Sequence, residues 1–297
     1  MGSVILLILG ILASGGYSLG LKPVNTRCKS IAELQLFNGC FTIVAGIGAF
    51  LAAAIRGSVY IPLSGLLVSA LFGIIFSLCV FSNLKALESG PVSITTLIIN
   101  FSLVMPLIYS FFFENGAVTP VRIAGVLMLC VCMFLFTNPK VTGEKKLSLK
   151  WLGLTLFSMF SNGALSLIMK IYAVKTENAY GGPFLAFSYL FATLTSFILF
   201  GILNRSLAEN ERCKIKAFFS GMMPLFIFLI GLANFSLNFI VVLLTTRLPA
   251  MIVYPAIQGG SPLITAIASY FLFKESVSWK KAAAILLGVA AIVLLNL

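Results

Sequence analysis

The stretch GGYSLGLK at residues 15–22 returns as GALSLIMK at residues 163–170. A Gly, a Ser, a Leu and a Lys hold the same four places in both copies, which lie 148 residues apart. Five apolar segments separate the copies, and an odd number of membrane crossings makes the second copy enter the bilayer from the opposite side. The spacing predicts an internal duplication, and inverted repeats of this kind are typical of transporters.

The composition places the chain in a membrane. Of the 297 residues, 60% are apolar and 9% are charged, and the mean hydropathy is +1.10. A soluble domain is about half apolar and about a quarter charged. Because a bilayer core of about 30 Å needs about 20 apolar residues per helix, the apolar runs predict ten spanning helices. They cover residues 2–21, 32–55, 62–84, 91–113, 120–138, 149–170, 183–203, 217–244, 249–273 and 279–296.

The predicted fold is an all-α integral membrane protein in which two inverted five-helix repeats, residues 1–140 and 147–297, surround a central cavity. A second offset of 159 residues matches Ser102 with Ser261 and Ser110 with Ser269. Chance alignment of two apolar segments would match Leu, Ile and Phe, so the polar matches favour duplication. The first segment also has the small residues of a signal-peptide cleavage site at 13–15, but it has no basic n-region.

The distribution of the basic residues predicts which side of the membrane each loop faces. The net charge is +12, yet Lys and Arg are scattered singly through the predicted loops, so a nucleic-acid surface is not indicated. Fifteen of the 20 lie in odd-numbered loops. The positive-inside rule therefore predicts that the odd loops face the cytoplasm and that both termini face outward.

The residues needed for several kinds of chemistry are missing. The sequence has no His and no Asp, which excludes a Ser-His-Asp triad, an aspartyl-phosphate nucleophile and a His-based zinc helix. It also lacks a Walker phosphate-binding loop, and none of its six Cys forms a Cys-x-x-Cys pair. We therefore expect no enzyme activity, no cofactor and no metal site.

The eight Glu residues all fall in predicted loops or at helix ends. A carboxylate at mid-depth is the usual handle for a lipophilic cation. Its absence predicts a neutral to weakly positive cavity, which suits neutral, zwitterionic or anionic solutes.

Polar side chains inside the predicted helices are candidates for substrate binding, because an unpaired amide in hydrocarbon costs several kcal/mol. Asn100 and Gln258 place an amide at nearly the same depth in each half. The candidate substrate-binding residues are Asn100, Gln258, Asn162, Tyr17, Ser14, Asn234, Asn238 and Tyr254. Asn234 and Asn238 are four residues apart and should share a helix face. Hydrogen bonds between helices are the alternative role for these residues.

On these motifs the chain resembles the drug/metabolite transporter superfamily, specifically its EamA-like ten-helix branch. In that family each half opens with a small-residue helix that ends in a basic residue, as residues 15–22 and 163–170 do. Each half closes with an aromatic run, a Glu and a turn, which FLFKESVS at 271–278 fits. In the first copy, FFFENGAVT at 111–119, Glu114 comes two places early.

The resemblance implies a carrier that works by alternating access without ATP, with substrate between the halves and peripheral fifth and tenth helices. It also implies cytoplasmic termini, opposite to the charge distribution. We expect a secondary transporter of a small polar metabolite, such as an amino acid, in the cell membrane, either monomeric or homodimeric. The alternative is a non-transporting lipid-handling or assembly protein. The expected partners are the solute and the lipid bilayer.

Overall fold

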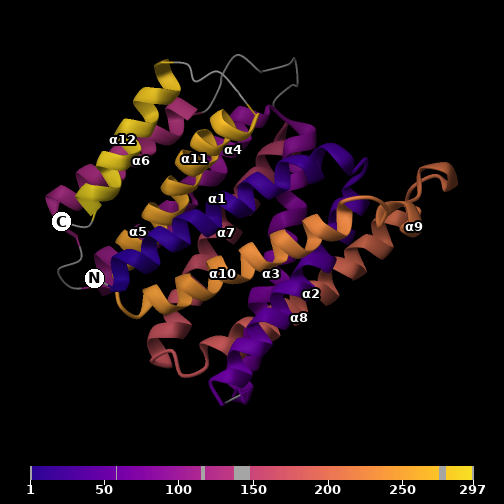
Figure 1. Ribbon diagram of the computed structural model, residues 1–297, viewed down its shortest axis with the longest axis horizontal. Helices are drawn as coiled ribbons and strands as arrows, with labels where there is room; N and C mark the ends of the chain where they lie inside the picture. Colours follow the sequence, from indigo (N-terminus) through magenta and orange to yellow (C-terminus); the bar gives the residue numbers. More distant parts are fainter. Residues whose placement is uncertain (1, 58, 115–117, 137–147, 274–278, 296–297) are drawn as a thin grey trace.

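The computed structural model describes residues 2–57, 59–114, 118–136, 148–273 and 279–295, and the regular structure of these residues is helical without a strand (Figure 1). A helix satisfies its own backbone hydrogen bonds, which an apolar segment in lipid requires. The elements are α1 (Gly2–Arg27), α2 (Ile31–Ile55), α3 (Leu63–Ser89), α4 (Val92–Asn100), η1 (Phe101–Leu103), α5 (Val104–Phe113), α6 (Pro120–Phe136), α7 (Leu149–Lys175), α8 (Gly181–Arg205), η3 (Glu209–Glu211), α9 (Ile215–Phe218), α10 (Met223–Thr245), α11 (Ala250–Phe273) and α12 (Trp279–Leu295).

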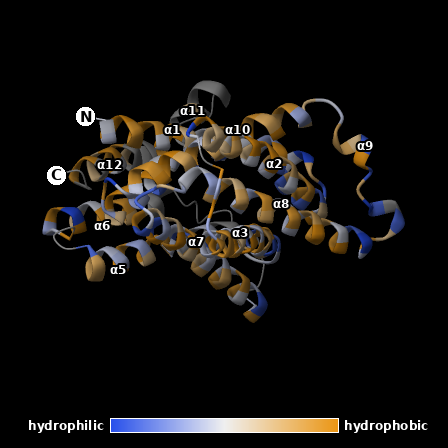
Figure 2. Ribbon diagram, turned by 90° about the horizontal axis from the view of Figure 1, so that it is seen from below, coloured by the Kyte–Doolittle hydropathy of each residue, from blue (hydrophilic) through white to orange (hydrophobic). Residues whose placement is uncertain are grey.

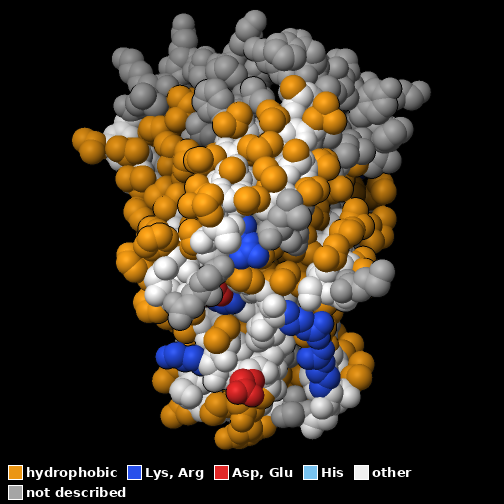
Figure 3. All heavy atoms as spheres, turned by 90° about the vertical axis from the view of Figure 1, so that its left-hand side faces the viewer, with side chains coloured by type: hydrophobic (Ala, Val, Ile, Leu, Met, Phe, Trp, Pro, Cys, Tyr) orange, Lys and Arg blue, Asp and Glu red, His pale blue; other side chains and the backbone are white. Residues whose placement is uncertain are grey.

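Seven helical stretches of the described chain are long and apolar enough to cross a membrane. They are Gly2–Arg27, Ile31–Ile55, Leu63–Ser89, Ile94–Phe113, Leu149–Lys175, Gly181–Arg205 and Met223–Thr245, and Pro120–Cys132 is a shorter apolar helix. Hydrophobic residues predominate along the helices (Figure 2), and hydrophobic side chains cover much of the middle of the face in Figure 3. These helices are consistent with a multi-pass membrane protein.

Two predicted segments are interrupted. The segment predicted at 91–113 is α4, one 3-10 turn and α5, because Pro106 has no N–H for the carbonyl of Ser102. The segment predicted at 217–244 begins as the short α9, and the spanning helix α10 begins only at Met223. Gly221 between them has φ +64°, a left-handed conformation that favours glycine and ends a helix.

Helices from the two halves of the sequence pack against one another. α2 packs on α8, and α6 packs on α12 (Figure 1). α1 contacts α10 and α11, whereas α7 contacts α3 and the α4–η1–α5 segment. The largest buried cluster draws its side chains from α1, α2, α3, α7, α8, α10 and α11. The interior of the bundle is therefore built jointly by both halves.

Candidate functional site

One face of α11 carries polar groups toward the interior of the bundle. Tyr254, Gln258 and Ser261 follow one another at intervals of four and three residues, so they share this face. The Tyr254 hydroxyl donates to the Ser166 carbonyl of α7 at 2.5 Å, and the Ser261 hydroxyl lies 3.0 Å from that of Ser18 on α1. Gln258 lies between these two contacts. It is partly exposed, although the other described residues from 250 to 261 are buried.

The two amides singled out by the sequence have similar surroundings. Asn100 ends α4 and is half-buried, as Gln258 is. Within the described part of the chain, neither side chain has a hydrogen-bond partner. Asn162 differs, because its amide donates to the Ser102 hydroxyl at 3.1 Å and ties α7 to η1. Asn100 and Gln258 therefore retain free hydrogen-bonding capacity for a ligand.

A second polar group lies between α8 and α10. Asn238 donates to the Asn234 side-chain oxygen at 3.1 Å, which confirms that the two share a helix face. Both also bind Tyr189: its hydroxyl donates to the Asn234 oxygen at 2.8 Å and accepts from Asn238 at 3.0 Å. Sequence reasoning missed Tyr189, whose signal was a phenol within an apolar segment. Because these three side chains satisfy one another, they hold α8 against α10.

The remaining predicted residues lie on α1. Tyr17 packs edge-on against Phe41 of α2, with 6.0 Å between ring centroids. Ser14 is buried one turn earlier. Neither side chain forms a hydrogen bond within the described residues, so both remain candidates.

Lys170 is a buried cation at one end of the bundle. Its side chain is 5% exposed, and its ammonium lies 2.7 Å from Oε1 of Glu114. The same ammonium donates to the backbone carbonyls of Thr245 at 2.5 Å and Leu248 at 3.0 Å. These carbonyls lie where α10 ends, so the cation neutralises the negative end of that helix.

Glu114 binds the backbone at the beginning of α11, as Lys170 binds it at the end of α10. Its Oε2 accepts the backbone N–H of Ala250 at 2.8 Å and also accepts the Ser110 hydroxyl. Ser110 in turn accepts the N–H of Met251 at 2.8 Å. A carboxylate at the N-terminus of a helix is stabilised by the helix dipole. The Lys170–Glu114 pair thus joins the end of α10 to the start of α11.

The sequence signal for this pair was incomplete. Lys170 was recognised as the last residue of the repeated motif, and Glu114 as a helix-end carboxylate, but nothing local linked them. By the repeat, Lys22 matches Lys170. The side chain of Lys22 and the residue Glu275 lie outside the described part of the chain.

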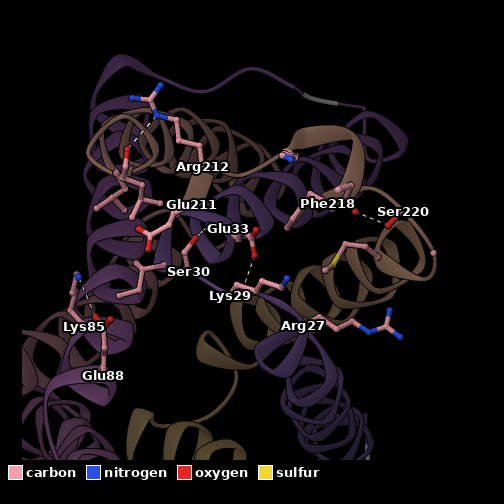
Figure 4. A pocket seen from close by; sticks show the side chains of 18 residues that line it. Arg27, Lys29, Ser30, Glu33, Lys85, Glu88, Glu211, Arg212, Phe218 and Ser220 are labelled. Atoms are coloured by element: carbon pink, nitrogen blue, oxygen red, sulfur yellow. Dashed lines mark hydrogen bonds and ion pairs between the residues drawn. The ribbon is translucent and has the colours of Figure 1, made fainter. Parts of the chain in front are cut away.

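The opposite end of the bundle holds a pocket of about 1020 Å³, which we call the mouth pocket. It lies among the ends of α1, α3 and α8, the beginnings of α2 and α10, and the η3–α9 segment. Its charged lining residues are Arg27, Lys29, Lys85, Arg212, Lys214, Glu33, Glu88 and Glu211. Glu33 and Glu211 lie near its centre, and Arg27 and Arg212 lie toward its rim (Figure 4). Basic residues outnumber acidic ones five to three.

Two thiols beside the mouth pocket have raised pKa values. Burial and the neighbouring Glu33 carboxylate raise the pKa of Cys28 to about 12, and the same causes raise the pKa of Cys213. Both thiols therefore stay protonated at neutral pH, and a protonated thiol is a poor nucleophile and a poor metal ligand. In the described residues, no group of three or more His, Cys, Asp or Glu is arranged to hold a metal ion.

Gln35 of α2 is fully buried, and neither polar atom of its amide has a partner in the described chain. Its neighbour Asn38 donates to Ser196 at 2.8 Å. We expect Gln35→Leu to raise the free energy of unfolding by about 1–2 kcal/mol, because an unsatisfied buried amide costs about that much. Thermal unfolding in detergent measures the change.

Asn38→Leu is the matched control for Gln35→Leu. It removes the hydrogen bond from the Asn38 amide nitrogen to Ser196, although the Asn38 oxygen has no partner in the described chain, so its melting temperature should fall below that of Gln35→Leu. A melting temperature of Gln35→Leu below that of the unaltered protein would contradict the interpretation and show that the Gln35 amide has a bound partner.

No family model and no curated protein matches this chain. Among solved structures, one described only as "Crystal structure of protein" is similar, with a TM-score of 0.75 and 15% identity. The match covers 99% of this chain and 96% of the other. At that identity the similarity extends to the fold alone. The class defined by these observations is an all-helical protein with helices suited to crossing a membrane several times.

Proposed function

We propose that the protein is a secondary transporter that carries a small polar metabolite, such as an amino acid, across the cell membrane by alternating access. The observation that carries the proposal is the difference between the two ends of the bundle. At one end Lys170 of α7 and Glu114 after α5 join the end of α10 to the start of α11. At the other end the mouth pocket opens a space of about 1020 Å³. A carrier that is closed at one end and open at the other is expected to have this arrangement.

The packing supports two inverted five-helix halves, residues 1–140 and 147–297. Exchanging the halves maps α1 onto α7, α3 onto α10, and the α4–η1–α5 segment onto α11. The contacts of α1 with α10 and α11 then become those of α7 with α3 and α4–η1–α5. The exchange also maps α2 onto α8 and α6 onto α12. The contact of α3 with α8 then becomes the contact of α10 with α2, and the α2–α8 and α6–α12 contacts stay the same. This correspondence, together with the repeated motifs, supports membership of the EamA-like transporters.

The unpartnered amides favour a solute with hydrogen-bonding groups. In this proposal Asn100 and Gln258 bind the solute, with Asn162, Tyr17 and Ser14 bordering the site. Three further side chains support the walls of this site without binding the solute, because their polar groups already form hydrogen bonds with neighbouring residues: Asn234, Asn238 and Tyr254. All described Glu residues lie at helix ends or in connections. The interior therefore suits neutral, zwitterionic or anionic solutes better than cations. The distribution of basic loops favours a cytoplasmic mouth pocket, whereas the resemblance to the EamA-like transporters favours cytoplasmic termini.

One observation favours the second candidate, a lipid-handling protein. A groove of about 500 Å³ lies between α5 and α7, and its walls are mostly apolar. It is lined by Met105, Ile108, Tyr109, Phe113, Leu167, Ile171 and Lys175. An acyl chain along the apolar wall with its anionic headgroup at Lys175 would fit this chemistry. The experiment below separates the two candidates.

We expect one class of small polar solutes to stabilise the purified protein and Gln258→Ala to abolish that effect. A ligand at one hundred times its dissociation constant stabilises by about 2.7 kcal/mol. Because Gln258 has no partner in the described chain, Gln258→Ala should leave the melting temperature of the ligand-free protein almost unchanged. Thermal unfolding against a panel of amino acids, sugars, nucleotides and organic phosphates measures both quantities.

Asn234→Ala is the matched control, since it should lower the ligand-free melting temperature by breaking the contacts with Tyr189 and Asn238. Uptake into proteoliposomes then tests transport of the stabilising solute. Stabilisation by phospholipids but by no polar solute would contradict the transport proposal and favour the lipid-handling candidate.

A further inference from the structure

The Lys170–Glu114 pair connects parts of the chain that are distant in sequence. Glu114 follows α5 directly, Lys170 belongs to α7, and their backbone partners are at the end of α10 and the start of α11. Two ionised groups and Ser110 together satisfy two carbonyls and two N–H groups. Loss of the pair therefore leaves several buried polar groups without partners at once.

We propose that the Lys170–Glu114 pair is a latch that holds this end of the bundle closed, and that its separation opens the interior from that end. This inference rests on the proposed transport function. An ion pair is suited to the role because burying both charges is costly, so the pair adds little net stability compared with apolar residues of the same size. It can specify a closed arrangement without making that arrangement too stable to leave.

Successive polar layers lie behind the latch. One face of α7 carries Lys170, then Ser166 and then Asn162, at intervals of four residues. On α11, which starts at the latch, Tyr254 contacts the Ser166 carbonyl and Gln258 follows one turn deeper. Separation of the latch would free the start of α11 and give access first to Ser166 and then to Gln258. The latch thus stands between one face of the membrane and the proposed substrate site.

The other described ion pair differs in position and exposure. Lys85 and Glu88 lie 3.1 Å apart beside the mouth pocket, and their side chains are 37% and 61% exposed. They lie three residues apart on the same helix, α3. Glu88→Gln is therefore a matched control for Glu114→Gln: both exchange a carboxylate for an amide in an ion pair.

The latch is tested by the accessibility of Ser166→Cys to a membrane-impermeant maleimide added from the side of the Glu114 end, in membranes. We expect slow labelling of Ser166→Cys alone and at least tenfold faster labelling when Glu114→Gln is added. Glu88→Gln should leave the rate unchanged. Exposed Thr246→Cys shows that the reagent reaches this face, and the chain without an added Cys gives the background of its six native thiols.

A labelling rate in Ser166→Cys/Glu114→Gln within twofold of Ser166→Cys would overturn the latch. If Glu114→Gln fails to fold, Ser110→Ala decides, because it removes the hydroxyl that donates to Glu114 and accepts the N–H of Met251, and so weakens the attachment of the latch to the start of α11. It should raise the rate about threefold, and an unchanged rate overturns the proposal. Labelling needs no solute, so the two proposals can fail separately. Faster labelling without any solute binding would reject the transport function and retain the latch. Solute transport with unchanged labelling would reject the latch and retain the transport function.

Discussion

Lys170→Met is expected to lower the free energy of unfolding by about 3–5 kcal/mol, because removing one partner of a buried ion pair leaves the other charge uncompensated. The side chain of Glu114 is 16% exposed and would lose its cation. The carbonyls of Thr245 and Leu248 would also lose their donor. Thermal or detergent-induced unfolding of the purified protein measures the loss.

The double variant Lys170→Met/Glu114→Gln should recover at least half of that loss. It buries no charge, and the amide oxygen of Gln at 114 can still accept from Ala250. The reversed pair Lys170→Glu/Glu114→Lys should recover little, because it places each charge at the wrong helix end. Lys85→Met should change stability by less than about 1 kcal/mol, as expected for an exposed pair. Simple additivity of the two single substitutions would show that Lys170 and Glu114 do not act together.

Gly73→Ala is expected to destabilise the protein by about 2–3 kcal/mol, at the upper end of the range for overpacked sites. A Cβ atom at Gly73 would lie 2.7 Å from the backbone nitrogen of Ala192 and closer still to the backbone oxygen of Ser188. Backbone atoms cannot rotate aside, so α3 and α8 must separate. Separation would also strain the bond from Ser77 to the Ala192 carbonyl, now 2.7 Å long. Small residues at such crossings permit close helix packing in membranes.

Gly201→Ala is the matched control on α8. A Cβ atom there has nothing within 4 Å, and Ala favours a helix over Gly by up to about 1 kcal/mol. We therefore expect an unchanged or higher melting temperature for Gly201→Ala and a clearly lower one for Gly73→Ala. Equal melting temperatures for the two variants would contradict the close crossing of α3 and α8.

The sequence predicted the apolar segments better than their ends. Residues 2–21, 62–84 and 149–170 were predicted to span, whereas α1, α3 and α7 extend to Arg27, Ser89 and Lys175. Hydrophobic runs were ended at charged residues, but long basic side chains can follow a helix while their heads reach polar surroundings. For the same reason Lys170 was taken as the end of a segment, although it lies inside α7. The break in the 91–113 segment was not predicted, because the missing backbone N–H of Pro106 was not taken into account.

The candidate site was predictable in part. The shared face of Asn234 and Asn238 followed from their spacing, because helical periodicity is local. The hydrogen-bond partners of the amides did not follow from the sequence. Asn162 binds Ser102, which is 60 residues away, whereas Asn100 and Gln258 have no partner in the described chain. Tyr189 was missed because its partners on α10 are 45 and 49 residues away.

The amino-acid sequence was sufficient to predict that the described chain is helical and that these helices are apolar enough for a membrane. Those properties follow from the composition of each segment and from backbone hydrogen bonds made within it. The contact of Lys170 with Glu114, which joins α10 to α11, depends on how the helices pack and could not be predicted from any one segment. A buried charge becomes tolerable through an opposite charge nearby, and here that charge comes from Glu114 after α5, 56 residues away from Lys170 in the sequence.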